Sequence, residues 1–219
     1  ERQRVALARA LARRPDVLLL DEPLSALDTR TRASASRRLA EVLRDTEVPA
    51  ILVTHDFAEA SLLGDTVAIL DDGHVVQRGT ASELAARPTT AFVADFTGAV
   101  VLHGTAALDA DATTLVTLAG GHQIRSTDVA EGPVAATIFP WEITIEPAGQ
   151  AAARSAQNHL EARVLSLTTI GGRVRLGLAG PEHLVAEVTT TAIAHLDLRV
   201  GSEVSATWKA AATRLIAMG

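Results

Sequence analysis

The chain has 219 residues, of which 47% are hydrophobic and 21% charged, and its formal net charge is −6. This composition is typical of a folded globular chain with one or two domains, and the acidic balance argues against general nucleic-acid binding. The absence of Cys excludes disulfides and cysteine metal sites and is compatible with the cytoplasm. The sequence contains no run of about 18 apolar residues, so no membrane span is predicted.

The first elements lead to a pair of carboxylates. A helix is predicted over residues 2–13, and Pro15 ends it. Four apolar residues, 17–20, then run directly into Asp21 and Glu22, and such a run predicts a strand buried on both faces of a parallel sheet. The two acids would then lie at the carboxyl edge of that sheet, where open α/β sheets bind ligands.

A second strand and its flanking helices repeat this pattern. Asp28 or Thr29 is expected to cap a helix over residues 30–45, and a strand over 50–54 ends just before His55. Asp56 is a candidate N-cap for the next helix, with Glu59 completing a capping box. Alternating strands and helices place this part in the α/β class.

Turn and capping residues predict a hairpin and a short helix after the second strand. A hairpin is predicted over residues 66–77, around the turn 71–73. Thr80 and Glu83 form a second capping-box pattern that opens a short helix, which stops by Pro88.

The pattern changes near Gly98, where short strands and glycine-containing turns begin. Residues 147–155 form an alanine-rich stretch that is interpreted as a linker. The strands on both sides of it predict a small barrel similar to an OB fold, or a sandwich. Trp141 and Trp208 are expected to lie in the core.

Four blocks of this sequence resemble the ATPase of ABC transporters, in order and in spacing. Residues 18–23 resemble its Walker B strand, 24–28 its D-loop and 53–56 its switch histidine segment, while 1–11 resemble the end of its signature motif and the helix that follows. The resemblance implies an α/β fold, a partial P-loop NTPase domain, with ATP and Mg²⁺ as cofactors.

The resemblance also implies a role for each matching residue. Asp21 would hold Mg²⁺, Glu22 would act as general base on the attacking water, and His55 would contact the γ-phosphate. Ser25 and Asp28 would lie at a dimer seam, although helix capping also explains them. Glu1 would present backbone N–H groups to the partner's nucleotide, in place of the commoner Gln.

Two motifs of that family do not occur in these 219 residues. Neither a Gly-x-x-x-x-Gly-Lys-Ser/Thr loop, which cradles the phosphates, nor a Q-loop is found. We therefore expect the chain to be the C-terminal part of a longer protein. We also expect this fragment to be inactive as an ATPase on its own.

The last third resembles the TOBE or Mop-type accessory domains that follow some importer ATPases. The matching stretches are 155–160, 196–201 and 209–210. By this resemblance Ser155, Asn158, Thr189 and Lys209 are the candidate oxyanion ligands, although Gln157 replaces the usual Arg. Dimerisation or a spacer role remains the alternative. The expected domains are thus 1–97, 98–150 and 151–219.

Taken together, the resemblances imply the ATP-hydrolysing subunit of an ABC importer for molybdate or a related oxyanion. Sulfate, iron, polyamine and sugar importers remain alternatives. So does a non-catalytic module that dimerises and senses an oxyanion. The expected partners are a second ATPase subunit, the membrane permease subunits and a separate substrate-binding protein, with no nucleic acid. The expected location is the cytoplasmic face of the cell membrane.

Overall fold

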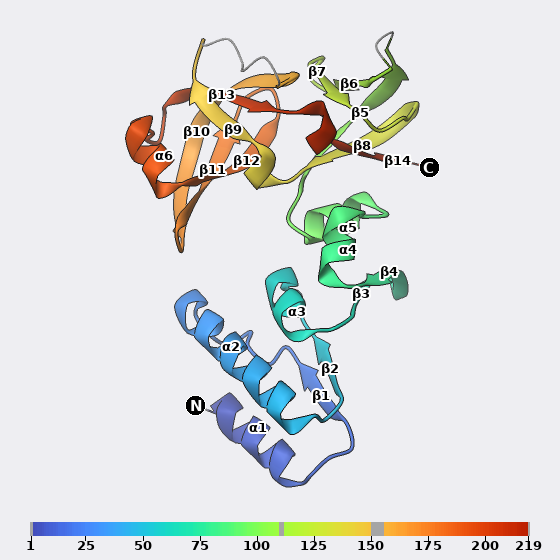
Figure 1. Ribbon diagram of the computed structural model, residues 1–219, viewed down its shortest axis with the longest axis vertical. Helices are drawn as coiled ribbons and strands as arrows, with labels where there is room; N and C mark the ends of the chain where they lie inside the picture. The colour runs from blue at the N-terminus through green and yellow to red at the C-terminus, as the bar shows by residue number, and fades with distance from the viewer. Residues whose placement is uncertain (1, 110–111, 150–155, 219) are drawn as a thin grey trace. The chain divides into compact units, whose positions relative to one another are not determined.

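The computed structural model describes residues 2–109, 112–149 and 156–218. It divides the chain into two compact units, Glu1–Arg87 and Pro88–Gly219 (Figure 1). The division of the sequence into three domains, 1–97, 98–150 and 151–219, stays a prediction. No helix in the part of the chain that is described is both long and apolar enough to cross a membrane.

The first unit combines helices with two pairs of strands. β1 and β2 are parallel, with Leu18 opposite Ala50 and Asp21 opposite Val53, while β3 and β4 form an antiparallel hairpin. This confirms the predicted α/β order. The elements are α1 Arg2–Ala12, β1 Leu18–Asp21, α2 Thr29–Thr46, β2 Ala50–Val53, α3 Phe57–Leu63, β3 Val67–Asp71, β4 His74–Gly79 and α4 Ala81–Ala86.

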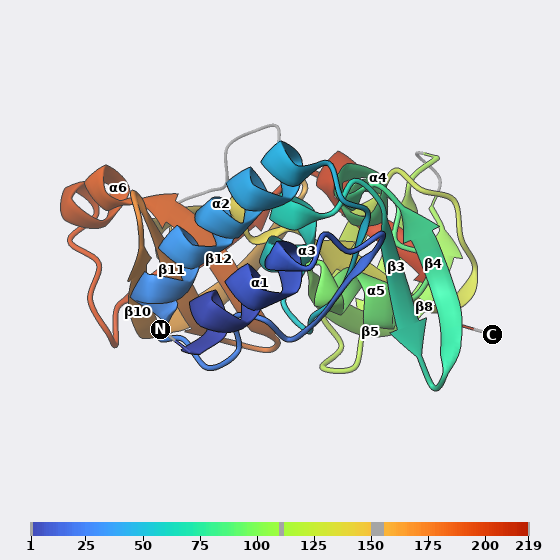
Figure 2. The same cartoon turned by 90° about the horizontal axis from the view of Figure 1, so that it is seen from below.

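The expected burial of β1 on both faces is wrong for this chain. Leu18 is only 4% exposed, whereas Leu19 is 71% exposed and Ile51, opposite it, is 60% exposed. Successive strand residues point to opposite faces, so these two side chains share one face of the sheet. Leu18, on the other face, is buried. Helices α1 and α2 lie side by side next to these strands in Figure 1, and Figure 2 shows the two helices side by side from below.

Side chains cap the helices of this unit largely as the sequence predicts. Asp28 Oδ1 accepts a hydrogen bond from Thr31 N–H at the start of α2. Thr80 and Glu83 form a reciprocal capping box at α4. Asp56 caps α3, but Glu59 does not complete the predicted box, because its carboxylate binds the Thr54 hydroxyl instead.

The second unit contains two five-stranded antiparallel sheets. Their strand orders are β14-β8-β5-β6-β7 and β12-β11-β10-β13-β9. This confirms the predicted β-rich appendage. Its elements are α5 Ala91–Phe96, β5 Val100–Leu108, β6 Thr114–Leu118, β7 Gln123–Ser126, β8 Gly132–Ile138, the 3₁₀ helix η1 Pro140–Glu142, β9 Thr144–Pro147, β10 Asn158–Ile170, β11 Arg173–Ala179, β12 His183–Thr189, α6 Thr190–His195, β13 Glu203–Trp208, the 3₁₀ helix η2 Ala210–Ala212 and β14 Arg214–Ala217.

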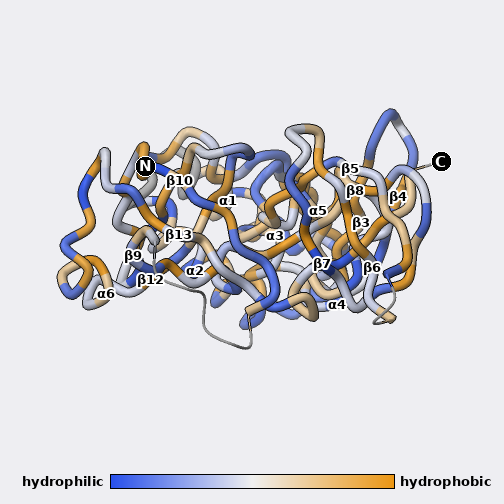
Figure 3. Tube along the Cα trace, turned by 90° about the horizontal axis from the view of Figure 1, so that it is seen from above, coloured by the Kyte–Doolittle hydropathy of each residue, from blue (hydrophilic) through white to orange (hydrophobic). Residues whose placement is uncertain are grey.

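The two sheets exchange their last strands. β9 leaves the first half of the unit and pairs with β13, while β14 returns from the second half and pairs with β8. The halves repeat one register, since Leu102 lies opposite Ala136 as Leu160 lies opposite Ala206. Their inward side chains form one hydrophobic cluster, and Figure 3 shows the hydrophobic segments of these strands in orange.

The two tryptophans have different environments. Trp208 is 2% exposed and lies in the core, as predicted. Trp141 is 51% exposed, so its predicted core position is wrong. It lies on η1, which carries the chain from one sheet to the other, and its ring stacks on Phe139 with centroids 4.3 Å apart.

Candidate functional site

The parallel pairing of β1 and β2 brings two distant segments together at one end of the strands. Asp21, the last residue of β1, lies opposite Val53, the last residue of β2. The pairing continues one step further, because Glu22 N–H donates to Val53 O at 2.9 Å. The segments 21–22 and 54–56 therefore meet at the carboxyl edge, as the sequence predicts.

Glu22 and His55 are in direct contact at this edge. His55 Nδ1 lies 2.6 Å from Glu22 Oε1, and His55 N–H donates to the same oxygen at 3.1 Å. A carboxylate oxygen accepts, so the ring donates from Nδ1. The structure therefore brings together the two residues that the sequence singled out as catalytic.

The backbone of Glu22 adopts a conformation that suits this contact. Its φ is +44°, in the left-handed region that residues other than glycine seldom adopt. Ser25 holds the loop, since both its N–H and its hydroxyl donate to Glu22 O, at 3.3 and 2.9 Å. Strain of this kind persists only when surrounding contacts fix it, and it gathers at functional sites.

The site favours a protonated His55. Its pKa is raised, first by the hydrogen bond to Glu22, then by the negative charge of Glu22, and less by Asp56. Desolvation and, to a smaller extent, the charge of Arg32 lower this pKa. The His55 side chain is 74% exposed, so water and salt screen these charges.

Asp21 fits a role in holding Mg²⁺. Asp21 is the last residue of β1, and it is exposed. Mg²⁺ prefers hard oxygen ligands and keeps several waters, so one or two carboxylates suffice beside a substrate's phosphate oxygens. The described residues contain no cluster of three or more His, Asp and Glu that could hold a metal by themselves. The donor set is thus of the right kind for an ion shared with phosphates.

The remaining predicted residues of the first unit have structural contacts as well. Ser25 supports Glu22, and Asp28 caps α2. Their roles at a dimer seam stay predictions. Glu1 lies outside the described residues.

Three residues of this site were not predicted as part of it. Thr54 and Glu59 are joined at 2.7 Å, and Arg32 Nη1 lies 3.8 Å from Asp56 Oδ2. Arg32 Nη2 also donates to Leu27 O. The Asp-x-x-Glu capping pattern was the available signal, but it was interpreted only as a helix start.

The candidate oxyanion ligands that the structure describes lie in different structural environments. Asn158 is 1% exposed, and its amide binds Arg125 at both backbone groups and the Thr213 hydroxyl. Thr189 caps α6, and Lys209 is exposed just before η2. Ser155 lies outside the described residues. Oxyanion binding therefore stays a prediction, and an anion at Asn158 would compete with this buried network.

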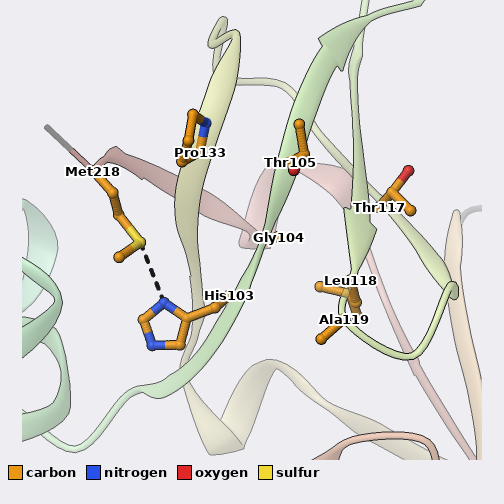
Figure 4. A pocket seen from close by; sticks show the side chains of 8 residues that line it. All are labelled: His103, Gly104, Thr105, Thr117, Leu118, Ala119, Pro133 and Met218. Atoms are coloured by element: carbon orange, nitrogen blue, oxygen red, sulfur yellow. Dashed lines mark hydrogen bonds between the residues drawn. The ribbon is translucent and has the colours of Figure 1, made fainter.

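A shallow groove of about 450 Å³ lies in the second unit beside the end of β14. Figure 4 shows His103 and Met218 on one side of it, with Nδ1 and Sδ 3.3 Å apart, and Leu118 on the other. None of the predicted site residues and no carboxylate lines this groove. It therefore offers no carboxylate for Mg²⁺.

Comparison with known proteins connects both units to one group of proteins. The TOBE domain family matches residues 154–215. The chain is 38% identical over 210 residues to the sulfate/thiosulfate import ATP-binding protein CysA 1 of Chromobacterium violaceum, covering 93% of this chain and 56% of that protein. It is 35% identical over 213 residues to the molybdate/tungstate import ATP-binding protein WtpC of Pyrococcus horikoshii, covering 97% and 60%.

A further similar protein is named for a different substrate. The Fe(3+) ions import ATP-binding protein FbpC of Rhizobium etli is 36% identical over 176 residues, covering 80% of this chain and 48% of that protein. The chain spans about half the length of the curated relatives it matches. Among solved structures, the cytoplasmic molybdate-binding protein ModG matches with a TM-score of 0.49 and 22% identity, covering 56% of this chain and 98% of that one.

Proposed function

Because the chain belongs to the ATP-binding subunits of ABC importers, the family that its motifs predict, we propose that it supplies the general base and the switch histidine of such an ATPase. The observation that carries the proposal is the contact between Glu22 and His55 at the carboxyl edge of β1 and β2. By the family resemblance, the attacking water would lie beside these two residues.

The chemistry of the three site residues follows from their positions. Phosphoryl transfer depends on positioning and charge neutralisation more than on covalent help. Glu22 is the acceptor for a proton from water, and it is free to accept once His55 Nδ1 leaves its Oε1 atom. His55, once released from Glu22, would contact the γ-phosphate. Asp21 would hold Mg²⁺, which neutralises phosphate charge.

Turnover needs parts that this sequence does not contain. The lysine and backbone N–H groups of a phosphate-binding loop do not occur in these 219 residues. The chain alone is therefore expected to show no magnesium-dependent ATP turnover. The proposed catalytic unit is the longer subunit, working as a dimer with a membrane permease and a substrate-binding protein at the cytoplasmic face of the cell membrane.

The substrate that we favour is an oxyanion such as molybdate or sulfate. Two relatives carry molybdate/tungstate and sulfate/thiosulfate in their names, and these are all doubly charged oxyanions. Iron and glycerol phosphate also occur among the relatives. The test of the substrate is calorimetric titration of the chain with molybdate, tungstate and sulfate, because saturable binding that Lys209→Ala abolishes would support the oxyanion class.

The ATPase proposal is tested on the longer subunit with Glu22→Gln. Loss of a general base lowers turnover about 10²–10⁴-fold, while binding of Mg-ATP should persist. Glu131→Gln, an exposed site on the second unit, is the matched control. Full turnover by Glu22→Gln would overturn the assignment of the base, and failure of the longer subunit to bind ATP would overturn the function.

A further inference from the structure

A closed ring of hydrogen bonds joins the residues on both sides of His55 in the sequence. The Thr54 hydroxyl donates to Glu59 Oε2 at 2.7 Å and accepts from Asp56 N–H at 3.1 Å. Asp56 Oδ1 in turn accepts from Glu59 N–H at 3.1 Å. The ring therefore runs from Thr54 to Glu59, then to Asp56 and back to Thr54, and His55 lies inside the segment that it closes.

His55 depends on its backbone for its position. Its side chain is 74% exposed, so packing does not fix the position of the imidazole. Both of its bonds end on one oxygen, Glu22 Oε1, and one of them starts from its own backbone N–H. A small rotation of the peptide between Thr54 and His55 would move both donors away from that oxygen together.

The burial of the Glu59 carboxylate in α3 is energetically unfavourable, and packing alone does not explain why a carboxylate lies there. The residue is 6% exposed, and its Oε1 is a buried atom without a hydrogen-bond partner among the described residues. A buried polar atom without a partner is unfavourable, and an apolar side chain of similar size would avoid it. What the carboxylate gains is the short bond from Thr54, which holds the ring together.

We infer that Glu59 is a positioning residue for His55, acting through the Thr54 hydroxyl to keep both donors of His55 on Glu22. The inference rests on the proposed function for its purpose, but its geometry belongs to the chain itself. The other charged groups near His55 are Asp56, which belongs to the ring of hydrogen bonds, and Arg32 of α2. Neither replaces the hydroxyl bond between Thr54 and Glu59.

The experiment is NMR of the ¹⁵N-labelled chain without nucleotide. Its two readouts are the ring Nδ1 chemical shift of His55 and the hydrogen exchange rate of the His55 amide. Thr54→Val removes the hydroxyl at nearly constant size. The His55 amide should then exchange about tenfold faster, the change expected for loss of one hydrogen bond, and the Nδ1 shift should move toward that of Glu22→Gln.

Two variants separate positioning from general stability. Thr54→Ser keeps the hydroxyl and should restore both His55 readouts. Thr90→Val removes the cap bond to Val93 N–H at α5, and it should leave His55 unchanged while it lowers stability. A folded Thr54→Val chain with the wild-type Nδ1 shift and exchange rate would overturn the inference.

Glu59→Gln covers the case in which Thr54→Val does not fold. The neutral amide accepts more weakly than a carboxylate, so both readouts should shift part of the way, and unchanged readouts would overturn the inference. No nucleotide is present, so this result does not depend on ATP hydrolysis. Conversely, a failure of the Glu22→Gln test in the longer subunit would overturn the ATPase proposal and leave the NMR result standing.

Discussion

Glu22 Oε1 accepts two hydrogen bonds from His55, one from the ring at 2.6 Å and one from the backbone N–H at 3.1 Å. The two residues are 33 positions apart in the sequence. Parallel pairing of β1 and β2 brings their segments together, and the left-handed backbone of Glu22 places its side chain there. A proposed base and a proposed phosphate sensor thus hold one another before any substrate binds.

Glu22→Gln should lower the pKa of His55 toward its ordinary value. The amide carries no charge and accepts a weaker hydrogen bond, and these are the two main reasons why the pKa of His55 is raised. NMR titration of the His55 ring measures the change. His74, whose ring binds Asp72 O, is the internal control and should give the same signals in both proteins. An unchanged pKa of His55 would contradict the prediction.

The same pair should make the stability of the first unit depend on pH. The pKa of His55 is raised in the folded state, so its stabilising contribution is fully present below the unfolded pKa of about 6.5 and is lost as pH rises through the folded pKa. The difference in urea midpoint between wild type and His55→Ala should therefore be larger at about pH 5.5 than at about pH 9. High salt should reduce it. A difference that grows with pH would have the wrong sign.

The meeting of Asp21, Glu22 and His55 could be predicted because apolar runs mark strands and parallel strands end at one edge. The capping box of Thr80 and Glu83 was also readable, since both partners lie within one turn. Local signals of this kind need no knowledge of the tertiary fold.

Other features depend on partners far along the chain. A period of two tells which face of a strand is apolar, but not which strand it pairs with, so the exchange of β9 and β14 could not be predicted. The exposure of Leu19 depends on what covers the sheet, and that of Trp141 on the path of η1 between sheets. Glu59 fitted a capping pattern, but its carboxylate accepts a hydrogen bond from the Thr54 hydroxyl instead.

Asn158→Ala should destabilise the second unit by about 1–3 kcal/mol, because buried backbone groups lose their partner. Asn158 is 1% exposed and binds Arg125 N–H, Arg125 O and the Thr213 hydroxyl. Urea unfolding followed by circular dichroism measures the loss. Gln157→Ala, at the exposed neighbouring site, should change stability by no more than about 0.5 kcal/mol. Equal effects of the two variants would refute a structural role for Asn158.

Gly104→Ala should cost about 1–3 kcal/mol through overpacking between β5 and β6. A Cβ at this position would lie 2.6 Å from Thr117 O and 2.8 Å from Val116 Cγ1, and a backbone oxygen in a sheet cannot easily move. Gly172→Ala is the matched control, because a Cβ there meets no atom within 4 Å. Thermal unfolding of both variants should show a lower midpoint for Gly104→Ala alone.

Ile138→Ala should lower the unfolding midpoint reported by Trp208, although the two residues belong to different halves of the second unit. Both are buried in one hydrophobic cluster, and removal of a buried Ile side chain costs about 2–5 kcal/mol. Fluorescence is read in a Trp141→Phe background, so that Trp208 is the only emitting Trp, and circular dichroism should give the same midpoint. Val129→Ala, at a side chain that is 74% exposed, should leave the midpoint unchanged. If Ile138→Ala shifts the circular dichroism but not the Trp208 signal, the halves unfold separately despite their exchanged strands.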